Sequence, residues 1–299
     1  MSGYWTDTAS FIDAHLGTGG AVCVALIDDE MAAHNVPFTS VTCLYQGNWL
    51  DGGTFKWDTA AVTRCQLPVP QYAIVGVNGQ VQFVGSGDMH EERIAEGVLA
   101  PPAGTGLVRG ARAIEGVLYV CGMKRQVFRR EGREQWRCLT AAIPQERGVV
   151  GFEAIDGYTH SEIYAVGWEG EVWHFDGTNW NQYDTGTNVI LLDVVCAGDG
   201  IVYAIGRGRK LVIGRGAQWR TIDLNLSVEL SSIAWFEGKL YACSTRDIFV
   251  WDGSLFNPLV IEGDRPRTIQ YLNSGEGGLC AVGPKDLFRF DGSTWFRID

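Results

Sequence analysis

The sequence predicts an all-β fold, a seven-bladed β-propeller in which each blade is a four-stranded antiparallel sheet. Three observations predict it. A pair of apolar strands recurs along the chain, a glycine follows each pair, and an aromatic residue stands at a regular spacing behind each glycine. The composition agrees, because 39 Gly residues and an aromatic share of 11% suit many short strands joined by tight turns.

The first strand of the pair carries a Tyr or Cys among small apolar residues. It occurs five times, at residues 116–122, 162–167, 200–206, 238–244 and 277–283. The second strand follows at residues 126–130, 171–175, 210–214, 247–251 and 286–290. The aromatic residues behind the turns are Trp136, Trp180, Trp219, Phe256 and Trp295. They are 44, 39, 37 and 39 residues apart, which is the period of one propeller blade.

Turn residues divide each repeat into a meander. The second strand is followed by Asp and Gly at residues 176–177, 252–253 and 291–292, which predicts two-residue hairpins because both residue types tolerate positive φ. An acidic residue and a Gly also precede the first strand, at residues 115–116, 199–200, 237–238 and 276–277. Two hairpins and the aromatic strand give four strands, named A to D from inside out. One such sheet cannot bury its own faces, so several must stack.

The pattern is weaker upstream. Residues 72–76 and 80–84 supply strands B and C of another blade, with His90 near the aromatic position. Residues 21–26 and 40–45 and Trp49 suit a divergent first blade, whose strand A at residues 11–15 could also be a short helix. The count is then seven blades, or six if the N-terminal segment is a cap. We expect one domain, 1–299, with blades at 1–53, 54–95, 105–142, 149–185, 189–225, 229–262 and 267–299.

The best repeat runs from Glu162 to Trp180 and contains Tyr-Ala-Val-Gly and Asp-Gly-Thr-Asn-Trp. It resembles a bacterial β-propeller repeat that reads Tyr-Ala-Val-Gly, an apolar strand, then Asp-Gly-Thr-x-Trp. It is also distantly similar to kelch and Asp-box repeats, although the kelch double glycine and the leading Ser or Thr of an Asp-box are absent. The resemblance implies the architecture and says little about activity.

Charge and cysteine content exclude several classes of protein. The net charge of −11 disfavours binding to nucleic acid, and no apolar run approaches the roughly 18 residues of a membrane span. The N-terminus lacks the features of a signal peptide, so we expect a cytoplasmic protein. The eight cysteines form no metal-binding spacing, and we interpret them as small buried residues in a reducing compartment, with disulfides as the alternative.

Catalytic signals are missing from the sequence. The five His residues fall on no shared position, and no nucleophile, phosphate or dinucleotide motif stands in a suitable context. Tyr119, Tyr164, Tyr203 and Tyr241 repeat at one blade position, which indicates packing between blades. We therefore expect no catalytic residue, metal or cofactor. If there is an enzyme site, it should use single residues of the A strands that line the channel, namely Arg112, Glu153 and Asp193.

The placement of charge suggests a binding face. The B–C and D–A loops of a propeller share one face, and the B–C loops are basic. We predict that the partner-binding face carries Lys124, Arg125, Arg207, Arg209, Lys210, Arg246 and Lys285. The irregular D–A connections at residues 96–106, 140–148 and 261–267 lie on the same face, and the opposite face should be acidic.

These features favour a non-catalytic propeller that binds a protein and is monomeric alone. A cytoplasmic inhibitor or immunity protein that neutralises a toxin or enzyme is the leading hypothesis, and an adaptor is equally compatible. One alternative is a propeller lectin that stacks sugars on Trp168, Trp173, Trp235 or Trp251. The other is a hydrolase or lyase with a site in the central channel.

Overall fold

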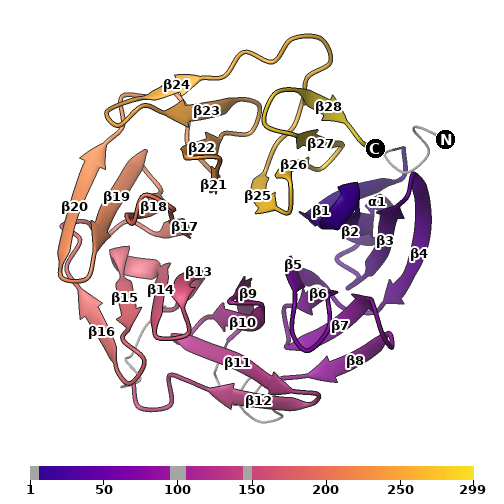
Figure 1. Cartoon of the computed structure of the whole chain (residues 1–299), viewed down its shortest axis with the longest axis horizontal. Helices are drawn as coiled ribbons and strands as arrows, with labels where there is room; N and C mark the ends of the chain where they lie inside the picture. Colours follow the sequence, from indigo (N-terminus) through magenta and orange to yellow (C-terminus); the bar gives the residue numbers. More distant parts are fainter. Residues whose placement is uncertain (1–6, 95–105, 144–149) are drawn as a thin grey trace. The chain divides into compact units, whose positions relative to one another are not determined.

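The computed structural model describes residues 7–94, 106–143 and 150–299, and most of them are in strands (Figure 1). The strands form seven four-stranded antiparallel sheets, each built from consecutive strands. Seven blades are therefore confirmed and the alternative of six is wrong, because the N-terminal segment forms a complete sheet of its own. The chain divides into two compact units, a terminal unit of Met1–Val62 and Val228–Asp299 and a central unit of Thr63–Ser227.

The terminal unit contains three sheets. They are β1 (Ala9–Leu16), β2 (Val22–Asp28), β3 (Thr39–Tyr45) and β4 (Asn48–Phe55); β21 (Ser232–Phe236), β22 (Lys239–Cys243), β23 (Ile248–Trp251) and β24 (Phe256–Pro258); and β25 (Tyr271–Gly275), β26 (Gly278–Gly283), β27 (Asp286–Phe290) and β28 (Trp295–Arg297).

The central unit contains the other four sheets, except that the first residues of strand β5 belong to the terminal unit. They are β5 (Thr59–Cys65), β6 (Gln71–Gly76), β7 (Gln80–Gly85) and β8 (His90–Arg93); β9 (Val108–Ile114), β10 (Val117–Gly122), β11 (Gln126–Gly132) and β12 (Gln135–Cys138); β13 (Phe152–Thr159), β14 (Glu162–Gly167), β15 (Val172–Phe175) and β16 (Trp180–Tyr183); and β17 (Leu191–Cys196), β18 (Val202–Gly206), β19 (Lys210–Arg215) and β20 (Gln218–Asp223).

The first and last sheets of the chain pack against each other in the terminal unit. The N–H of Phe11 on β1 donates to the carbonyl of Pro284 at 2.9 Å, and the Asn273 amide on β25 donates to Asp13 at 2.7 Å. Leu16 and Val24 share an apolar cluster with Val282 of the last sheet. Because each sheet is one continuous stretch of chain, the first blade exchanges no strand with the C-terminus.

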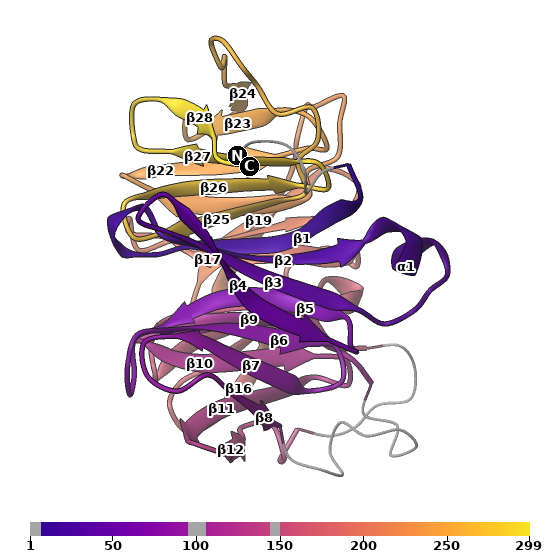
Figure 2. The same ribbon diagram turned by 90° about the vertical axis from the view of Figure 1, so that its right-hand side faces the viewer.

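A short helix, α1 (Asp29–Ala33), lies in the connection between β2 and β3 and projects from the first sheet (Figure 2). The Asp28 carboxylate caps it by accepting the N–H groups of Glu30 and Met31, both at 3.0 Å. An Asp followed by two acidic residues is a helix-start signal, so this element could have been read from the sequence. The segment at residues 11–15, left open between strand and helix, lies in β1.

Packing between sheets uses the repeated tyrosines. Tyr119 and Tyr164 are fully buried, and Tyr203 and Tyr241 are nearly so, which confirms the packing role expected from their repetition. The Tyr164 ring packs in an apolar cluster that joins the β13–β16 and β17–β20 sheets. Its hydroxyl donates to Glu162 at 3.2 Å and accepts the Gly216 N–H at 3.1 Å, so its polar end is satisfied at the edge of the core.

The Asp-Gly turns differ from the expected two-residue hairpins. Each connection has four residues, and only the glycine takes a positive φ, which is 94° at Gly177. The Asp176 carboxylate instead accepts the N–H groups of Thr178 at 2.9 Å and Asn179 at 2.7 Å. Two turns of the same kind hold the pKa of Asp252 and of Asp291 at about 2 through backbone N–H donors. These aspartates are structural, as expected.

His174 is half-buried on β15. Its ring stacks between Tyr164 and Tyr183, with centroid distances of 4.6 and 6.3 Å. Burial lowers the pKa of His174 below its ordinary value of 6.5, because the charged imidazolium is poorly solvated there.

Acidification from about pH 7 to about pH 5 should therefore destabilise the protein through His174, because the unfolded imidazole binds a proton that the folded one resists. The thermal unfolding midpoint should fall less over this range in His174→Gln than in wild type. His34→Gln, the same substitution at an exposed position, is the control for replacing a histidine by glutamine. Equal slopes in wild type and His174→Gln would contradict the prediction.

Candidate partner-binding face

The B–C connection of a sheet lies at the same end as the start of its strand A, because the strands are antiparallel; we call this the B–C end. In the central unit, backbone contacts at the B–C end link one sheet to the next. The N–H of Lys124, between β10 and β11, donates to the carbonyl of Val150 at 2.8 Å, and Met123 forms a β-bridge with Gly151. The D–A connections at residues 96–106 and 140–148 fall largely outside the described residues, whereas 261–267 is described.

The seven basic residues predicted for this face differ in exposure. Arg207, Arg209 and Arg246 are exposed, and Lys124, Lys210 and Lys285 are partly buried. Lys210 forms an ion pair with Asp223, and Lys285 donates to Asp29 at 2.6 Å. The basic character of the B–C end is therefore reduced by ion pairs within the protein.

Arg125 is not a surface residue. Its side chain is 3% exposed and forms a bidentate ion pair with Glu171, which also accepts the indole N–H of Trp173 at 3.0 Å. The guanidinium lies 5.3 Å from the Trp173 ring centroid. The sequence placed Arg125 on the partner-binding face because turn residues are usually exposed. The structure places it between two sheets, where its charge is neutralised.

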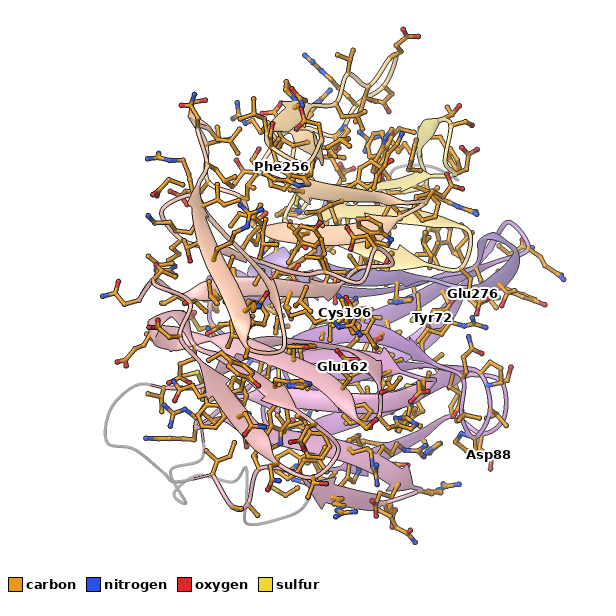
Figure 3. The ribbon with its side chains drawn as sticks, turned by 60° about the vertical axis from the view of Figure 1, so that its left-hand side comes forward. Tyr72, Asp88, Glu162, Cys196, Phe256 and Glu276 are labelled. Atoms are coloured by element: carbon orange, nitrogen blue, oxygen red, sulfur yellow. The ribbon has the colours of Figure 1, made fainter. Side chains whose placement is uncertain are left out.

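The opposite end of the sheets is of mixed charge. Glu162 accepts two hydrogen bonds from Arg215, at 2.8 and 2.9 Å, and Asp156 lies within β13. Asp88, at a C–D turn, is an exposed acidic residue whose side chain is 88% exposed (Figure 3). The face that was expected to be acidic therefore also carries an arginine, Arg215.

The three channel candidates lie on neighbouring A strands, because β9, β13 and β17 run side by side. Arg112 faces Asp156 at 3.5 Å, and the Asp193 carboxylate accepts the N–H of Val194 at 2.8 Å. Asp156 also accepts the Cys196 N–H at 2.8 Å, so it ties three strands together. Burial raises the pKa of Asp156, while Arg112 and the Cys196 N–H oppose that rise.

Glu153, the remaining candidate, belongs to a cluster at the B–C end of the central unit. The Arg109 guanidinium donates three hydrogen bonds to its carboxylate at 3.0–3.2 Å. The Trp168 indole N–H donates to the same carboxylate at 2.6 Å. Register shifts in β9 and β13 beside Arg109 and Glu153 direct these two side chains toward each other across the sheets. The carboxylate therefore fixes an exposed Arg and a half-buried Trp in one arrangement.

Arg109 was not predicted, and Trp168 was considered only as a sugar-stacking residue. One signal could have singled out Trp168, because the position directly after strand B holds non-aromatic residues in the other clear repeats. These are Met123, Arg207, Thr245 and Pro284. Nothing in the sequence indicated the contact with Arg109, which comes from a different blade.

Three of the four tryptophans of the lectin alternative lie in different environments. Trp168 donates to Glu153, Trp173 is buried against Glu171, and Trp251 packs on Phe256 with ring centroids 5.0 Å apart. Within residues 7–94, 106–143 and 150–299, no three His, Cys, Asp or Glu side chains are grouped to hold a metal ion. The same residues include no helix long and apolar enough to cross a membrane.

Comparison with known proteins identifies the family. The chain is 39% identical over 284 residues to the immune protein Tsi7 of Pseudomonas aeruginosa strain PAO1, and the match covers 92% of each protein. The chain belongs to the Tsi7 family of immune proteins. The immunity function expected from the sequence is thereby confirmed, and the function implies a protein partner. No protein-family model matches the Tsi7-related chain, so the specific repeat family suggested by the Tyr-Ala-Val-Gly motif is not identified.

Solved structures agree with the seven-bladed propeller fold of this Tsi7 relative. YCF48 bound to D1 peptide matches with a TM-score of 0.67 and 13% identity, covering 96% of this chain and 93% of that one. Sqt1 of Saccharomyces cerevisiae matches with a TM-score of 0.64 and 10% identity, covering 98% and 85%. At these identities the likeness concerns the fold alone.

Two of the predicted binding residues should behave differently on substitution. Arg125→Ala leaves the Glu171 carboxylate buried without its cation, so we expect a loss of about 3–5 kcal/mol in the free energy of unfolding. Arg207→Ala, at an exposed position, should change it by less than about 0.5 kcal/mol. Urea unfolding measures both. Similar losses in the two variants would contradict the expected cost of leaving Glu171 buried without its cation.

Proposed function

We propose that this protein is a non-catalytic immunity protein that binds a protein toxin directly and neutralises it. The observation that carries the proposal is the 39% identity to an immune protein over 92% of both chains. We place it in the cytoplasm, where eight thiols stay reduced, as a monomer until it meets its partner.

The contacts of the channel candidates support a non-catalytic role. A catalytic acid or base needs to reach a substrate. The Glu153 carboxylate is held by Arg109 and Trp168, the Arg112 guanidinium faces the Asp156 carboxylate, and the Asp193 carboxylate accepts the Val194 N–H. Glu153 and Arg112 thereby join neighbouring sheets, which is sufficient reason for their presence.

We propose that the partner binds the B–C end of the central unit. Trp and Arg dominate the binding energy of protein interfaces, and here Trp168 and Arg109 are held in position before binding. Leu107 is 43% exposed at the entry to the same strand as Arg109, and Arg207 and Arg209 are exposed in the connection after β18. An apolar group flanked by exposed guanidinium groups suits a partner segment with an apolar side chain and carboxylates.

The proposal is tested with the protein encoded by the neighbouring reading frame. Co-expression of this chain should restore growth to cells that the neighbouring product inhibits, and the two proteins should co-purify. Trp168→Ala should weaken the complex by at least about 2 kcal/mol, roughly 30-fold in Kd by calorimetry, because it removes the central aromatic contact.

Charge reversal is the second arm of this test. Arg207→Glu with Arg209→Glu should weaken binding, whereas Lys239→Glu should not, because Lys239 is exposed at the A–B end of its sheet. Unchanged affinity in both the Trp168 and the double Arg variants would overturn the proposed surface. If the neighbouring protein stays toxic and does not bind the wild-type chain, the proposal that this chain neutralises that protein is overturned.

A further inference from the structure

Two of the eight cysteines face each other across a pair of strands. Cys23 on β2 is the direct register partner of Cys43 on β3. Opposite residues of antiparallel strands have Cα atoms about 4.5–5.5 Å apart, and a disulfide needs about 4.4–6.8 Å. The backbone therefore already has the separation that a covalent link between the two sulfurs requires.

The two thiols differ in exposure. Val22, Val24 and Leu26 alternate with Cys23 along β2 and pack against the last sheet, so Cys23 points from the other face, where it is fully buried. Cys43 is half-buried. A side-chain hydrogen bond with Cys23 lowers the pKa of Cys43, whereas burial raises that of Cys23.

The remaining cysteines lack this arrangement. In the described sheets, no other two cysteines are register partners; Cys138 lies opposite Phe128, and Cys196 lies opposite Val202. Burial raises the pKa of the Cys121 and Cys280 thiols well above the ordinary range, so their reactive thiolate forms are scarce.

We propose that Cys43 and Cys23 are a reversible oxidation site, at which hydrogen peroxide converts the two thiols to a disulfide. The Cys43 thiolate attacks one peroxide oxygen, the O–O bond breaks, and hydroxide leaves. Cys43 is then a sulfenic acid. The Cys23 sulfur then attacks the Cys43 sulfur and releases water. The two thiols lose two electrons, the peroxide gains them, and two waters form in all. A dithiol reductant reverses the reaction.

The link has a defined structural consequence. The segment between the cysteines carries α1, and residues 30–37 are exposed throughout (Figure 2). Its base is held by Lys285, which donates to Asp29 at 2.6 Å and to the carbonyl of Ala9 at 2.7 Å. The disulfide closes this segment covalently at the strands that support it.

The test oxidises the folded wild-type chain with hydrogen peroxide, blocks free thiols, and analyses unreduced peptides by mass spectrometry. We expect a peptide joining residues 23 and 43, which disappears after dithiothreitol. It should form about tenfold or more faster than oxidation at Cys138 or Cys196, the other half-buried cysteines.

Two variants separate the roles of the sulfurs. In Cys23→Ser the sulfenic acid on Cys43 has no resolving thiol, so dimedone should label it about tenfold more than in wild type. In Cys43→Ser the buried Cys23 should stay unmodified. Absence of the linked peptide in wild type, or earlier oxidation of Cys138 or Cys196, would overturn the proposal. The wild-type measurement decides even if a variant does not fold.

Discussion

The structure depends on one constraint: a four-stranded sheet has two apolar faces, and only another sheet can remove each of them from water. In four of the sheets a tyrosine at one position of strand B serves this purpose, and Tyr119 and Tyr164 are completely buried there. Burial of large aromatic side chains is the dominant favourable contribution in such an interface. The hydroxyls of Tyr119, Tyr164 and Tyr203 reach the A–B end of their sheets, where they find polar partners, as Tyr119 does with His160 at 2.9 Å. This allows a large aromatic group to be buried without leaving its polar atom unsatisfied.

Ion pairs between neighbouring sheets add specificity to this apolar packing. Between the β9–β12 and β13–β16 sheets, Arg125 pairs with Glu171, Arg109 with Glu153 and Arg112 with Asp156. A buried ion pair contributes little net stability, but breaking it is costly, so such pairs favour one arrangement of neighbouring sheets over others. The same contacts explain why basic and acidic residues that look available in the sequence are engaged within the fold. A protein with a net charge of −11 can therefore have arginines that serve only its own architecture.

The features relevant to binding lie where the repeat is broken. The register shifts beside Arg109 and Glu153 bring two side chains of different sheets together, and Trp168 occupies a position that is not aromatic in the other clear repeats. The α1 segment is likewise an insertion between two regular strands. A repeated position serves packing that is common to all sheets, whereas a single departure from it is free to serve recognition. The family membership indicates that such recognition concerns a protein partner.

The sequence by itself determined the fold class and the packing role of the tyrosines, and it favoured seven blades over six, because these features depend on local alternation and on a period that recurs along the chain. It also favoured an immunity protein, on composition and on the absence of catalytic motifs. It placed Arg125 on the surface, missed Arg109, and described the Asp-Gly turns wrongly. Only the tertiary structure decided these points, and it alone set Cys23 against Cys43. The physical reason is that a side chain's partner across two strands or two sheets depends on register and stacking, which residues distant in sequence fix together.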